Sequence, residues 1–334
     1  MDLVILAAGR GTRMESNLPK VLHGLRGKSL IEHSLSTAEP LKFEKTIVVV
    51  GYGAEKVRST LGNGGLEFVL QKRQLGTGHA LLQARKEASG SSLLVVPGDV
   101  PLVRKHTLKG FINFFRAEKP AASVLTVQVE DPQGYGRIIR EEGEGIARIV
   151  EQKDADINER QIDEINTGIF ALRNDSSLWK GLNSLDMDNA QGEIYLTDLI
   201  ALYKGEGRKV LGWKGGDEEE FLGVNTRKDL AQAHSVLNRR KIDDLLDSGV
   251  TITDPSNTYV DDDVQCGRDT VIRPFSLLEK GSTVGSNCDI GPFARIVNSQ
   301  LGNGVRLFRS ELEDCEVRDR SSIGPFSAYR ETKI

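Results

Sequence analysis

Residues 260–296 read VDDDVQCGRDTVIRPFSLLEKGSTVGSNCDIGPFARI, and an apolar residue returns at every sixth position of this stretch. The positions that fit the period are Val260, Cys266, Ile272, Leu278, Val284, Ile290 and Ile296. Steps of five or six continue the pattern through Leu301, Leu307, Leu312, Val317, Ile323 and Tyr329. Such a repeat is typical of a parallel β-helix, in which each repeat forms one short strand and points its apolar residue inward. The last quarter of the chain is therefore predicted to be a β-helix.

Glycines and cysteines fit the same pattern. Glycines occur close to the inward positions, and we expect tight corners at Gly285, Gly291, Gly302 and Gly324. Cys266 takes an inward position, while Cys288 and Cys315 each precede one by two residues. Three widely spaced cysteines form neither a disulfide framework nor a zinc motif, so we interpret all three as packing residues.

A helical pattern precedes the repeat. Between Thr226 and Leu246 the apolar residues have helical spacing, at Leu230, Ala233, Leu237, Ile242, Leu245 and Leu246. Thr226 is a candidate N-cap with Asp229 three residues later, and Ser248-Gly249 ends the run. We therefore expect three parts: a domain over 1–225, a connecting helix over 226–248 and the β-helix over 249–334.

The first 175 residues alternate β-branched runs with amphipathic stretches, which favours an α/β domain with a mostly parallel sheet. The expected strands are Leu3–Ala7, Thr46–Val50, Leu66–Leu70, Leu93–Val96 and Ser123–Val129. The expected helices are Leu30–Ala38, Glu55–Leu61, Gly78–Ala88 and Lys105–Ala117. From 134 to 222 the pattern loosens, and we expect short extended pieces and loops that build a second wall over the end of the sheet.

Composition limits the classes of partner. The chain has 334 residues, 38% of them hydrophobic and 28% charged, with a net charge of −4. This charge gives no case for a nucleic-acid partner. The longest apolar runs, such as Leu3–Ala8, fall far short of the roughly 20 residues of a membrane helix. Met1-Asp2 leads directly into a strand without a basic segment, so we expect no secretory signal, no membrane partner and a cytoplasmic protein.

The segment Leu6-Ala-Ala-Gly-Arg-Gly-Thr-Arg-Met14 follows the first expected strand. Glycines and small residues at the end of a strand expose backbone N–H groups that can hold phosphate oxygens. A dinucleotide-binding loop would need glycine at Met14 and an acidic residue in place of Gly51-Tyr52-Gly53. A P-loop would need glycine at Leu22. The sequence therefore excludes both of these phosphate-binding motifs.

Further segments accompany the loop in a fixed order. They are Leu18-Pro-Lys-Val-Leu22, Gln71 with Gln74-Leu-Gly-Thr-Gly-His-Ala80, Gly98-Asp-Val-Pro-Leu102, Gly134-Tyr-Gly-Arg137, Val150-Glu151, Glu164-Ile-Asn-Thr-Gly168 and Gly223-Val-Asn-Thr226. Asp99 ends a buried strand, which is a natural place for a Mg²⁺ ligand.

Together these motifs resemble the bacterial bifunctional N-acetylglucosamine-1-phosphate uridyltransferase/glucosamine-1-phosphate acetyltransferase family over about residues 3 to 330. The resemblance implies a Rossmann-like nucleotidyltransferase domain, a long linker helix and a left-handed β-helix that assembles as a homotrimer. It implies UTP and N-acetylglucosamine 1-phosphate as substrates and Mg²⁺ as cofactor, in the synthesis of cell-wall and lipopolysaccharide precursors.

The resemblance also implies roles for individual residues. The nucleotide loop would comprise Leu6, Ala7, Ala8 and Gly9, and the uracil would be selected by Gln71, Gly76 and Thr77. The sugar would be bound by Gly136, Glu151 and Asn166. The phosphates and Mg²⁺ would be bound by the segment Pro97, Gly98 and Asp99. Arg13, Lys20 and Asn225 would complete this part of the site. In this scheme the metal ligands are Asp99 and Asn225, and the catalytic residues are Arg13, Lys20 and Asp99.

The charges of the substrates explain why these residues would be sufficient for nucleotidyl transfer. The sugar phosphate is an anionic nucleophile at neutral pH, so the displacement needs cations rather than a general base. Arg13 would stabilise the leaving pyrophosphate, and Lys20 would hold the attacking phosphate. Many relatives carry a tyrosine where this chain has Pro97, so we expect altered affinity there rather than lost activity.

Two alternatives stay open. One is a nucleotidyltransferase for another pair, such as glucose 1-phosphate with UTP or dTTP. The other is a non-catalytic regulatory subunit of the same fold, although such proteins tend to lose the basic and metal-binding positions that this chain retains.

The second activity of the family depends on later coils of the β-helix, including a histidine. No histidine follows His234 in this sequence, and Glu331 stands where the family continues with proline. We therefore expect no acetyl transfer from acetyl-CoA to glucosamine 1-phosphate.

Overall fold

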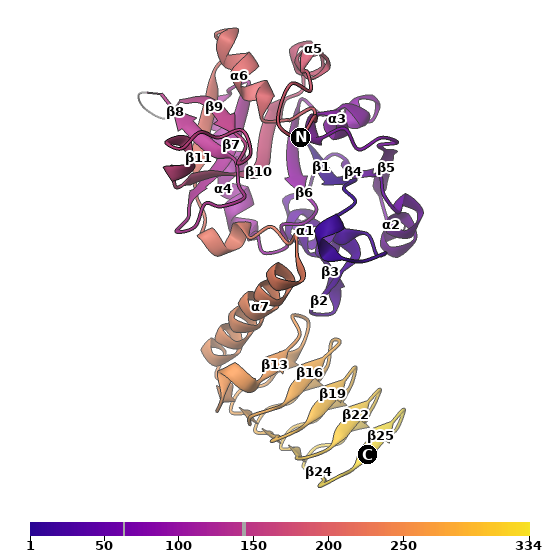
Figure 1. Cartoon of the computed structure of the whole chain (residues 1–334). Helices are drawn as coiled ribbons and strands as arrows, with labels where there is room; N and C mark the ends of the chain where they lie inside the picture. The colour runs from indigo at the N-terminus through magenta and orange to yellow at the C-terminus, as the bar shows by residue number, and fades with distance from the viewer. Residues whose placement is uncertain (63, 142–144) are drawn as a thin grey trace. The chain divides into compact units, whose positions relative to one another are not determined.

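The computed structural model describes residues 1–62, 64–141 and 145–334 (Figure 1). The chain divides into two compact units. Unit 1 comprises Met1–His23 and Ser29–Asp229, and unit 2 comprises Gly24–Lys28 and Leu230–Ile334. Within the described residues, no helix is long and apolar enough to cross a membrane.

Unit 1 is built on a mixed sheet with the strand order β11-β7-β10-β6-β1-β4-β5. These strands are β1 (Asp2–Ala7), β4 (Thr46–Val50), β5 (Leu66–Leu70), β6 (Ser92–Pro97), β7 (Ala122–Gln128), β10 (Glu164–Arg173) and β11 (Val210–Lys214). Neighbours pair in parallel except for β10, which runs antiparallel to both β6 and β7. The carboxyl ends of β1, β4, β5 and β6 therefore share one edge of the sheet.

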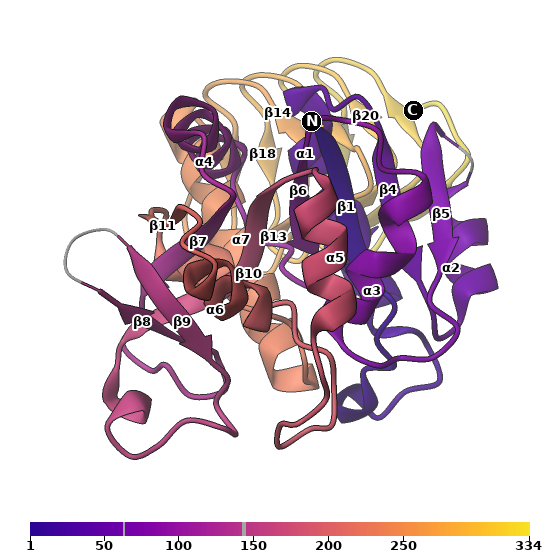
Figure 2. The ribbon, with the colours of Figure 1, turned by 90° about the horizontal axis from the view of Figure 1, so that it is seen from above.

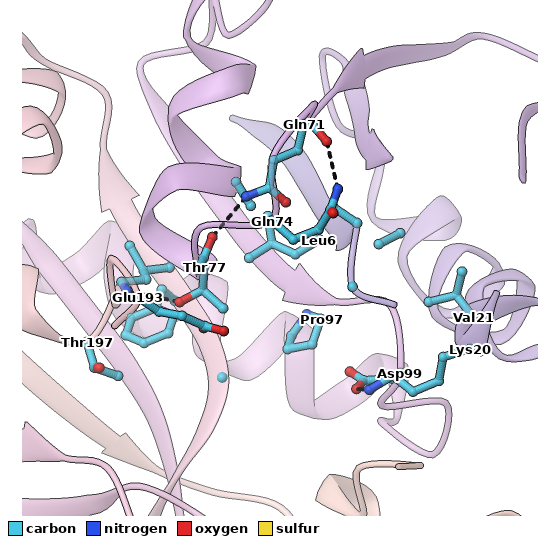
Figure 3. Close-up of a pocket in the computed structure, with 18 of the residues that line it drawn as sticks. Leu6, Lys20, Val21, Gln71, Gln74, Thr77, Pro97, Asp99, Glu193 and Thr197 are labelled. Carbon is cyan, nitrogen blue, oxygen red and sulfur yellow. Dashed lines mark hydrogen bonds and ion pairs between the residues drawn. The ribbon is translucent and has the colours of Figure 1, made fainter. Parts of the chain in front are cut away.

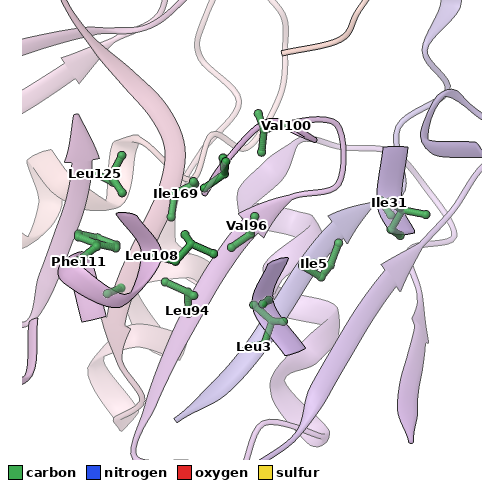
Figure 4. Packing of buried hydrophobic residues seen from close by; sticks show 14 of the residues in the cluster. Leu3, Ile5, Ile31, Leu94, Val96, Val100, Leu108, Phe111, Leu125 and Ile169 are labelled. Atoms are coloured by element: carbon green, nitrogen blue, oxygen red, sulfur yellow. The ribbon is translucent and has the colours of Figure 1, made fainter. Parts of the chain in front are cut away.

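Helices cover both faces of this sheet (Figure 2). One core contains α1 (Leu30–Ala38), α2 (Ala54–Leu61) and α4 (Lys105–Glu118). The other contains α3 (Thr77–Gln83), α5 (Ser176–Ser184) and α6 (Asp198–Gly205). Alternate residues of β1 divide between the cores, since Leu3 and Ile5 join the first and Val4 joins the second. Figure 4 shows part of the first core, in which Leu94 and Val96 of β6 lie between Leu3 and Ile5 of β1 and Phe111 of α4.

The predicted α/β architecture is confirmed. Every strand and helix expected in the first 130 residues is present. The observed ends of most strands differ from the predicted ends by one residue, and the end of α3 differs by several. The expected helix over Gly78–Ala88 is a shorter α-helix followed by a 3₁₀ turn at Ala84–Lys86.

The interpretation of residues 134–222 as short extended pieces and loops was correct only in part, because the region also contains a long strand of the main sheet and two helices. This region supplies β8 (Arg137–Arg140), β9 (Ile146–Val150), β10, α5, α6 and β11. The ten-residue β10 lies inside the main sheet between β6 and β7, and its register shifts between Asn166 and Phe170. Its first half, Glu-Ile-Asn-Thr-Gly, is too polar to give the apolar run that marks a buried strand.

The connecting helix is α7 (Arg227–Asp247). Thr226 and Asp229 cap each other as predicted, because the Asp229 N–H donates to Thr226 Oγ1 at 3.2 Å and the Thr226 N–H donates to Asp229 Oδ2 at 2.9 Å. Ala233, Leu237 and Ile242 are buried as expected, whereas Leu246 is 39% exposed.

Unit 2 contains the predicted parallel β-helix as three stacked sheets, β12-β15-β18-β21-β24, β13-β16-β19-β22-β25 and β14-β17-β20-β23. The strands are β12 (Thr251–Ile252), β13 (Tyr259–Val260), β14 (Gln265–Cys266), β15 (Val271–Ile272), β16 (Leu277–Glu279), β17 (Thr283–Val284), β18 (Asp289–Ile290), β19 (Arg295–Val297), β20 (Gln300–Leu301), β21 (Arg306–Leu307), β22 (Glu311–Glu313), β23 (Glu316–Val317), β24 (Ser322–Ile323) and β25 (Ala328–Arg330). Ile272 pairs with Ile290 and Ile290 with Leu307, so each coil stacks its inward residues on the next. Tyr329 was expected inside but is 38% exposed in the last strand.

The corners of the coils differ from the prediction. Gly291 and Gly324 do have positive φ, of 92° and 117°. Gly285 and Gly302 do not, and they are needed for space, since a Cβ on Gly285 would lie 2.5 Å from the Gly302 carbonyl oxygen of the next coil. Most left-handed corner positions are occupied by other residues: Asp269, Phe275, Lys280, Asn287, Phe293, Asn298, Arg309, Asp314, Arg320, Phe326 and Glu331.

Candidate functional site

A cavity of about 300 Å³ opens in unit 1 where β1 and β6 end (Figure 3). Its lining includes most of the expected site residues, namely Leu6, Ala7, Ala8, Gly9, Lys20, Gln71, Gly76, Thr77, Pro97, Asp99, Glu151 and Asn166. Figure 3 shows Gln71, Leu6 and Thr77 in one corner, Lys20 and Asp99 in a second, and Glu193 and Thr197 in a third. Residues from distant parts of the chain therefore meet around one pocket.

The glycine-rich loop connects β1 to the Asp99 corner. Gly11 has φ of 64°, and a Cβ there would lie 2.5 Å from Lys20 Cβ, so both its backbone conformation and its close contact require glycine. A 3₁₀ turn, Thr12–Met14, follows and buries Met14 while Arg13 stays exposed. The loop thus holds Lys20 and Arg13 on the same side of the site.

Four polar side chains converge at the Asp99 corner. Lys20 Nζ donates to Asp99 Oδ2 and, at 2.9 Å, to Asn225 Oδ1. Arg13 Nη2 donates to the same Asn225 oxygen at 3.0 Å. The Val224 N–H donates to the Asp99 carbonyl at 2.9 Å, which brings Asn225 beside the end of β6. Asp99 and Asn225 thereby direct two oxygens at one cation.

This donor set fits a divalent cation. Mg²⁺ prefers oxygen ligands and commonly takes one or two from protein and the rest from water and substrate phosphates. Within residues 1–62, 64–141 and 145–334 no group of three or more His, Cys, Asp or Glu side chains could hold a metal ion. Two protein oxygens would leave the remaining coordination of a divalent cation to water and phosphate oxygens.

The Gln71 corner is formed by the end of β5 and the loop before α3. The Gln71 N–H donates to the Val50 carbonyl at 2.8 Å, which extends the β4–β5 pairing by one residue. Gly76 has φ of 106°, and a Cβ there would lie 2.5 Å from the Ile194 carbonyl oxygen. Thr77 Oγ1 accepts a hydrogen bond from the Leu196 N–H at 3.0 Å. The segment around Ile194 thus packs tightly on this loop and fixes its backbone.

Glu151 and Asn166 line the third corner together with Glu193 and Thr197, and Gly136 lies behind them. Thr197 Oγ1 donates to Glu151 Oε1 at 3.1 Å, and the Asn166 N–H donates to the Gly136 carbonyl at 2.8 Å. A Cβ on Gly136 would lie 3.4 Å from both carboxylate oxygens of Glu151, so glycine leaves space beside them. Burial is the main cause that raises the pKa of Glu151, and the hydrogen bond from Thr197 opposes it.

Four predicted residues lie outside the cavity wall. Arg13 and Asn225 contact Lys20 or each other, Gly98 holds the strand end through its N–H to the Leu6 carbonyl at 2.9 Å, and Gly136 supports Asn166. Pro97 does line the cavity, and its Cγ lies 2.8 Å from the position of a Cβ on Gly168.

Sequence reasoning missed part of the wall. The additional lining residues are Val21, Gln74, Ala80, Gly168, Phe170, Glu193, Leu196 and Thr197. Gln74 and Ala80 stand in a motif that was recognised, but Glu193 and Thr197 come from the region interpreted as loops. Nothing in the spacing of 189–197 indicates that this segment packs on Gly76.

Comparisons with known proteins agree with this geometry. Residues 3–161 match the MobA-like NTP transferase domain. The chain is 43% identical over 330 residues to the bifunctional protein GlmU of Brevibacillus brevis, covering 98% of this chain and 71% of that protein. It is 44% identical over 330 residues to the bifunctional protein GlmU of Lactobacillus delbrueckii subsp. bulgaricus, with the same coverage. A crystal structure of UDP-glucose pyrophosphorylase complexed with UDP-glucose superposes with a TM-score of 0.61 at 18% identity, over 72% of this chain and 98% of that one.

Proposed function

The chain belongs to the GlmU family and is a nucleotidyltransferase, and from this we propose that it transfers the uridylyl group of UTP to N-acetylglucosamine 1-phosphate. The products would be UDP-N-acetylglucosamine and pyrophosphate. We assign this reaction to residues 1–225, in the cytoplasm, as a supply of precursors for cell-wall and lipopolysaccharide synthesis.

One observation carries the proposal. Arg13, Lys20, Asp99 and Asn225 come from three separate parts of the chain and join in one hydrogen-bonded cluster beside a cavity. A cluster with two cations and two oxygen ligands suits the meeting of two phosphates and a metal ion. The other two corners then take the parts of the substrates that carry no phosphate, which are the base and the sugar.

The cationic side chains of Lys20 and Arg13 would lower the barrier by stabilising negative charge on the phosphates. Both substrates are polyanions, so the barrier arises largely from repulsion between the sugar phosphate and the α-phosphate of UTP. Lys20 would hold the attacking phosphate, and Arg13 would stabilise the charge that develops on the leaving pyrophosphate. The sugar phosphate is already ionised, so the chain needs no general base, and displacement would proceed in line with inversion at phosphorus.

Asp99 and Asn225 would hold Mg²⁺, whose positive charge would offset the repulsion between the two phosphates. Lys20 Nζ donates to both proposed metal ligands in the structure, so Lys20 would compete with a metal ion for these two oxygens. The third N–H of its ammonium group would be available to the sugar phosphate.

The sugar would lie in the Glu151 corner. The Glu151 carboxylate would accept hydrogen bonds from sugar hydroxyls, Asn166 would contact the acetamido group, and Gly136 would leave room for the ring. A second candidate substrate is glucose 1-phosphate, which lacks the acetamido group.

Turnover tests the proposal. Purified protein is incubated with UTP, N-acetylglucosamine 1-phosphate and Mg²⁺, and pyrophosphate release is measured. A panel with glucose 1-phosphate and dTTP defines the selectivity. Preference for glucose 1-phosphate would contradict the proposed sugar and leave the transfer of a nucleotidyl group intact.

We also propose that the β-helix assembles as a homotrimer, as family membership implies. Apolar side chains on the surface of unit 2 support an assembly of copies. Tyr259 is 55% exposed on β13, and Phe275 and Phe293 stack at a centroid distance of 5.1 Å while each stays about half exposed. Light scattering coupled to size-exclusion chromatography tests this, since a trimer has three times the 36.7 kDa mass of the chain.

A further inference from the structure

The Gln71 side chain is oriented by a contact that the proposed mechanism does not use. Gln71 is 2% exposed, and Figure 3 shows its amide in the corner with Leu6 and Thr77. Gln71 Nε2 lies 3.1 Å from the Gly76 carbonyl oxygen. A carbonyl oxygen can only accept, so the amide atom that faces it must be the NH₂ group and not the oxygen. The Gly76 carbonyl thus favours one orientation of the Gln71 amide, through the longer of the two contacts that its nitrogen makes.

His79 supports the same orientation. Its Nδ1 lies 2.9 Å from Gln71 Nε2. Because that nitrogen of Gln71 is a donor, Nδ1 must accept and must carry no proton. One hydrogen of the Gln71 NH₂ group is therefore donated to Gly76 and the other to His79. No N–H of this group is left to bind a ligand.

The other side of the imidazole faces Gln83. Gln83 Nε2 donates to the His79 carbonyl at 3.0 Å and lies 3.3 Å from the ring Nε2. Two neighbours of the ring are therefore amide donors, which compete for the one unprotonated nitrogen of a neutral imidazole, while the Arg73 backbone offers an acceptor to a ring N–H. The shorter contact, at 2.9 Å to Gln71, favours an unprotonated Nδ1.

The same surroundings disfavour a charged imidazolium, which would turn an N–H toward a donor. The pKa of His79 agrees with this, since burial lowers it and a smaller effect of the Arg73 backbone opposes the shift. His79 is thus a neutral acceptor at neutral pH.

With Nε2 occupied, only the amide oxygen of Gln71 remains for a ligand. Among the residues that the structure describes, no side chain or backbone group donates a hydrogen bond to this oxygen. Uracil carries an N–H donor at N3, whereas cytosine carries a bare acceptor nitrogen at the same position. An amide oxygen accepts from the first and repels the second.

We propose that His79 is the positioning residue that sets the pyrimidine selectivity of this site, because it holds the Gln71 amide with its oxygen toward N3 of the base. The proposal rests on the proposed function only in taking the Gln71 corner as the base site. His79 touches no substrate in this scheme. Thymine has the same N3–H donor as uracil, so the contact selects UTP and dTTP together against CTP.

Calorimetric titration of UTP and CTP in the presence of Mg²⁺ tests the proposal without requiring turnover. Three variants are compared with the wild-type chain. His79→Leu removes the acceptor, His79→Asn restores an acceptor oxygen at the δ position, and Gln83→Ala removes the contact on the opposite side of the ring. Thermal unfolding confirms that each variant is folded.

We expect the wild-type chain to bind UTP more tightly than CTP. In His79→Leu the ratio of the two Kd values falls by about tenfold or more, because a released amide can turn its NH₂ group toward cytosine. His79→Asn and Gln83→Ala keep the wild-type ratio within about threefold, which is clearly smaller than the change expected for His79→Leu. A wild-type ratio in His79→Leu, or an equal loss in His79→Asn or Gln83→Ala, would overturn the proposal. Failure of the wild-type chain to release pyrophosphate from UTP would instead contradict the proposed function.

Discussion

Replacing Asp99 with asparagine tests the assignment of the metal site, because it removes one negative charge and nearly preserves the shape of the side chain. In the structure the Asp99 carboxylate accepts from Lys20, and the two side chains are 21% and 14% exposed. Lys20 keeps its 2.9 Å bond to Asn225 in the variant, and an amide oxygen at position 99 can still accept from it. We therefore expect the free energy of unfolding to change by about 1 kcal/mol or less, as is common for pairs that water reaches.

The expected effect on catalysis is far larger. A metal ion contributes several kcal/mol to the stabilisation of transition-state charge, and about 4 kcal/mol corresponds to roughly a 1000-fold change in rate. Asp99→Asn should therefore lower kcat/KM for UTP by about 1000-fold while the protein stays folded. The contrast between a small effect on stability and a large effect on rate is what identifies a functional carboxylate.

The assay measures pyrophosphate release over a range of Mg²⁺ concentrations, together with thermal unfolding of the same samples. Asp243→Asn serves as the control, because Asp243 is an exposed carboxylate on α7. If Asp99→Asn retains turnover within a few-fold of the wild-type value at the same Mg²⁺ concentration, the metal assignment is refuted.

Three further predictions concern a binding residue, a thiol and the β-helix. Burial raises the pKa of Glu151 above its ordinary value of 4.5. The stability that Glu151 contributes is therefore present below pH 4.5 and is lost as the pH rises through the raised pKa. Glu151→Gln should raise Tm more at pH 7 than at pH 4 and weaken binding of the sugar phosphate, and an equal change in Tm at both pH values would contradict this. Burial raises the pKa of Cys266 to about 12, so a thiol reagent at pH 8 should label Cys266 much more slowly in the folded protein than in denaturant, and equal rates would contradict the inward position. Ile296 is fully buried, so Ile296→Ala should cost about 2–5 kcal/mol of stability by calorimetry, while Gln300→Ala at an exposed neighbouring position should have little effect.

The β-helix was predictable from sequence because each coil depends on its own short repeat. Inward positions such as Ile272 and Ile290 stack directly on each other, so three consecutive repeats make one coil and the next coil repeats the same pattern. Tyr329 departs from the pattern, since it lies in β25 at the end of its sheet and is 38% exposed.

Local motifs were equally informative in the first half of the chain. Gly11 and Gly76 are required by their own backbone angles and close contacts, so their roles follow from nearby sequence. The strand β10 could not be predicted in this way, because a bulge and a polar first half hide its place inside the sheet.

The wall residues around Leu196 and Thr197 were missed because they reach the site through contacts between distant parts of the chain. Thr197 contacts Glu151 across 46 positions of sequence, and Leu196 contacts Thr77 across 119. Contacts between residues so far apart in the sequence depend on the path of the segment after α5. The spacing of residues within 189–197 does not predict that path. The expected lack of acetyl transfer stays a prediction, tested by supplying acetyl-CoA and glucosamine 1-phosphate.

The most direct test of the central claim is ³¹P NMR of the purified chain with UTP, N-acetylglucosamine 1-phosphate and Mg²⁺. The proposed function predicts loss of the UTP and sugar-phosphate signals and equal appearance of UDP-N-acetylglucosamine and pyrophosphate, dependent on both Mg²⁺ and Asp99. Unchanged spectra, or release of inorganic phosphate without the sugar nucleotide, would contradict it.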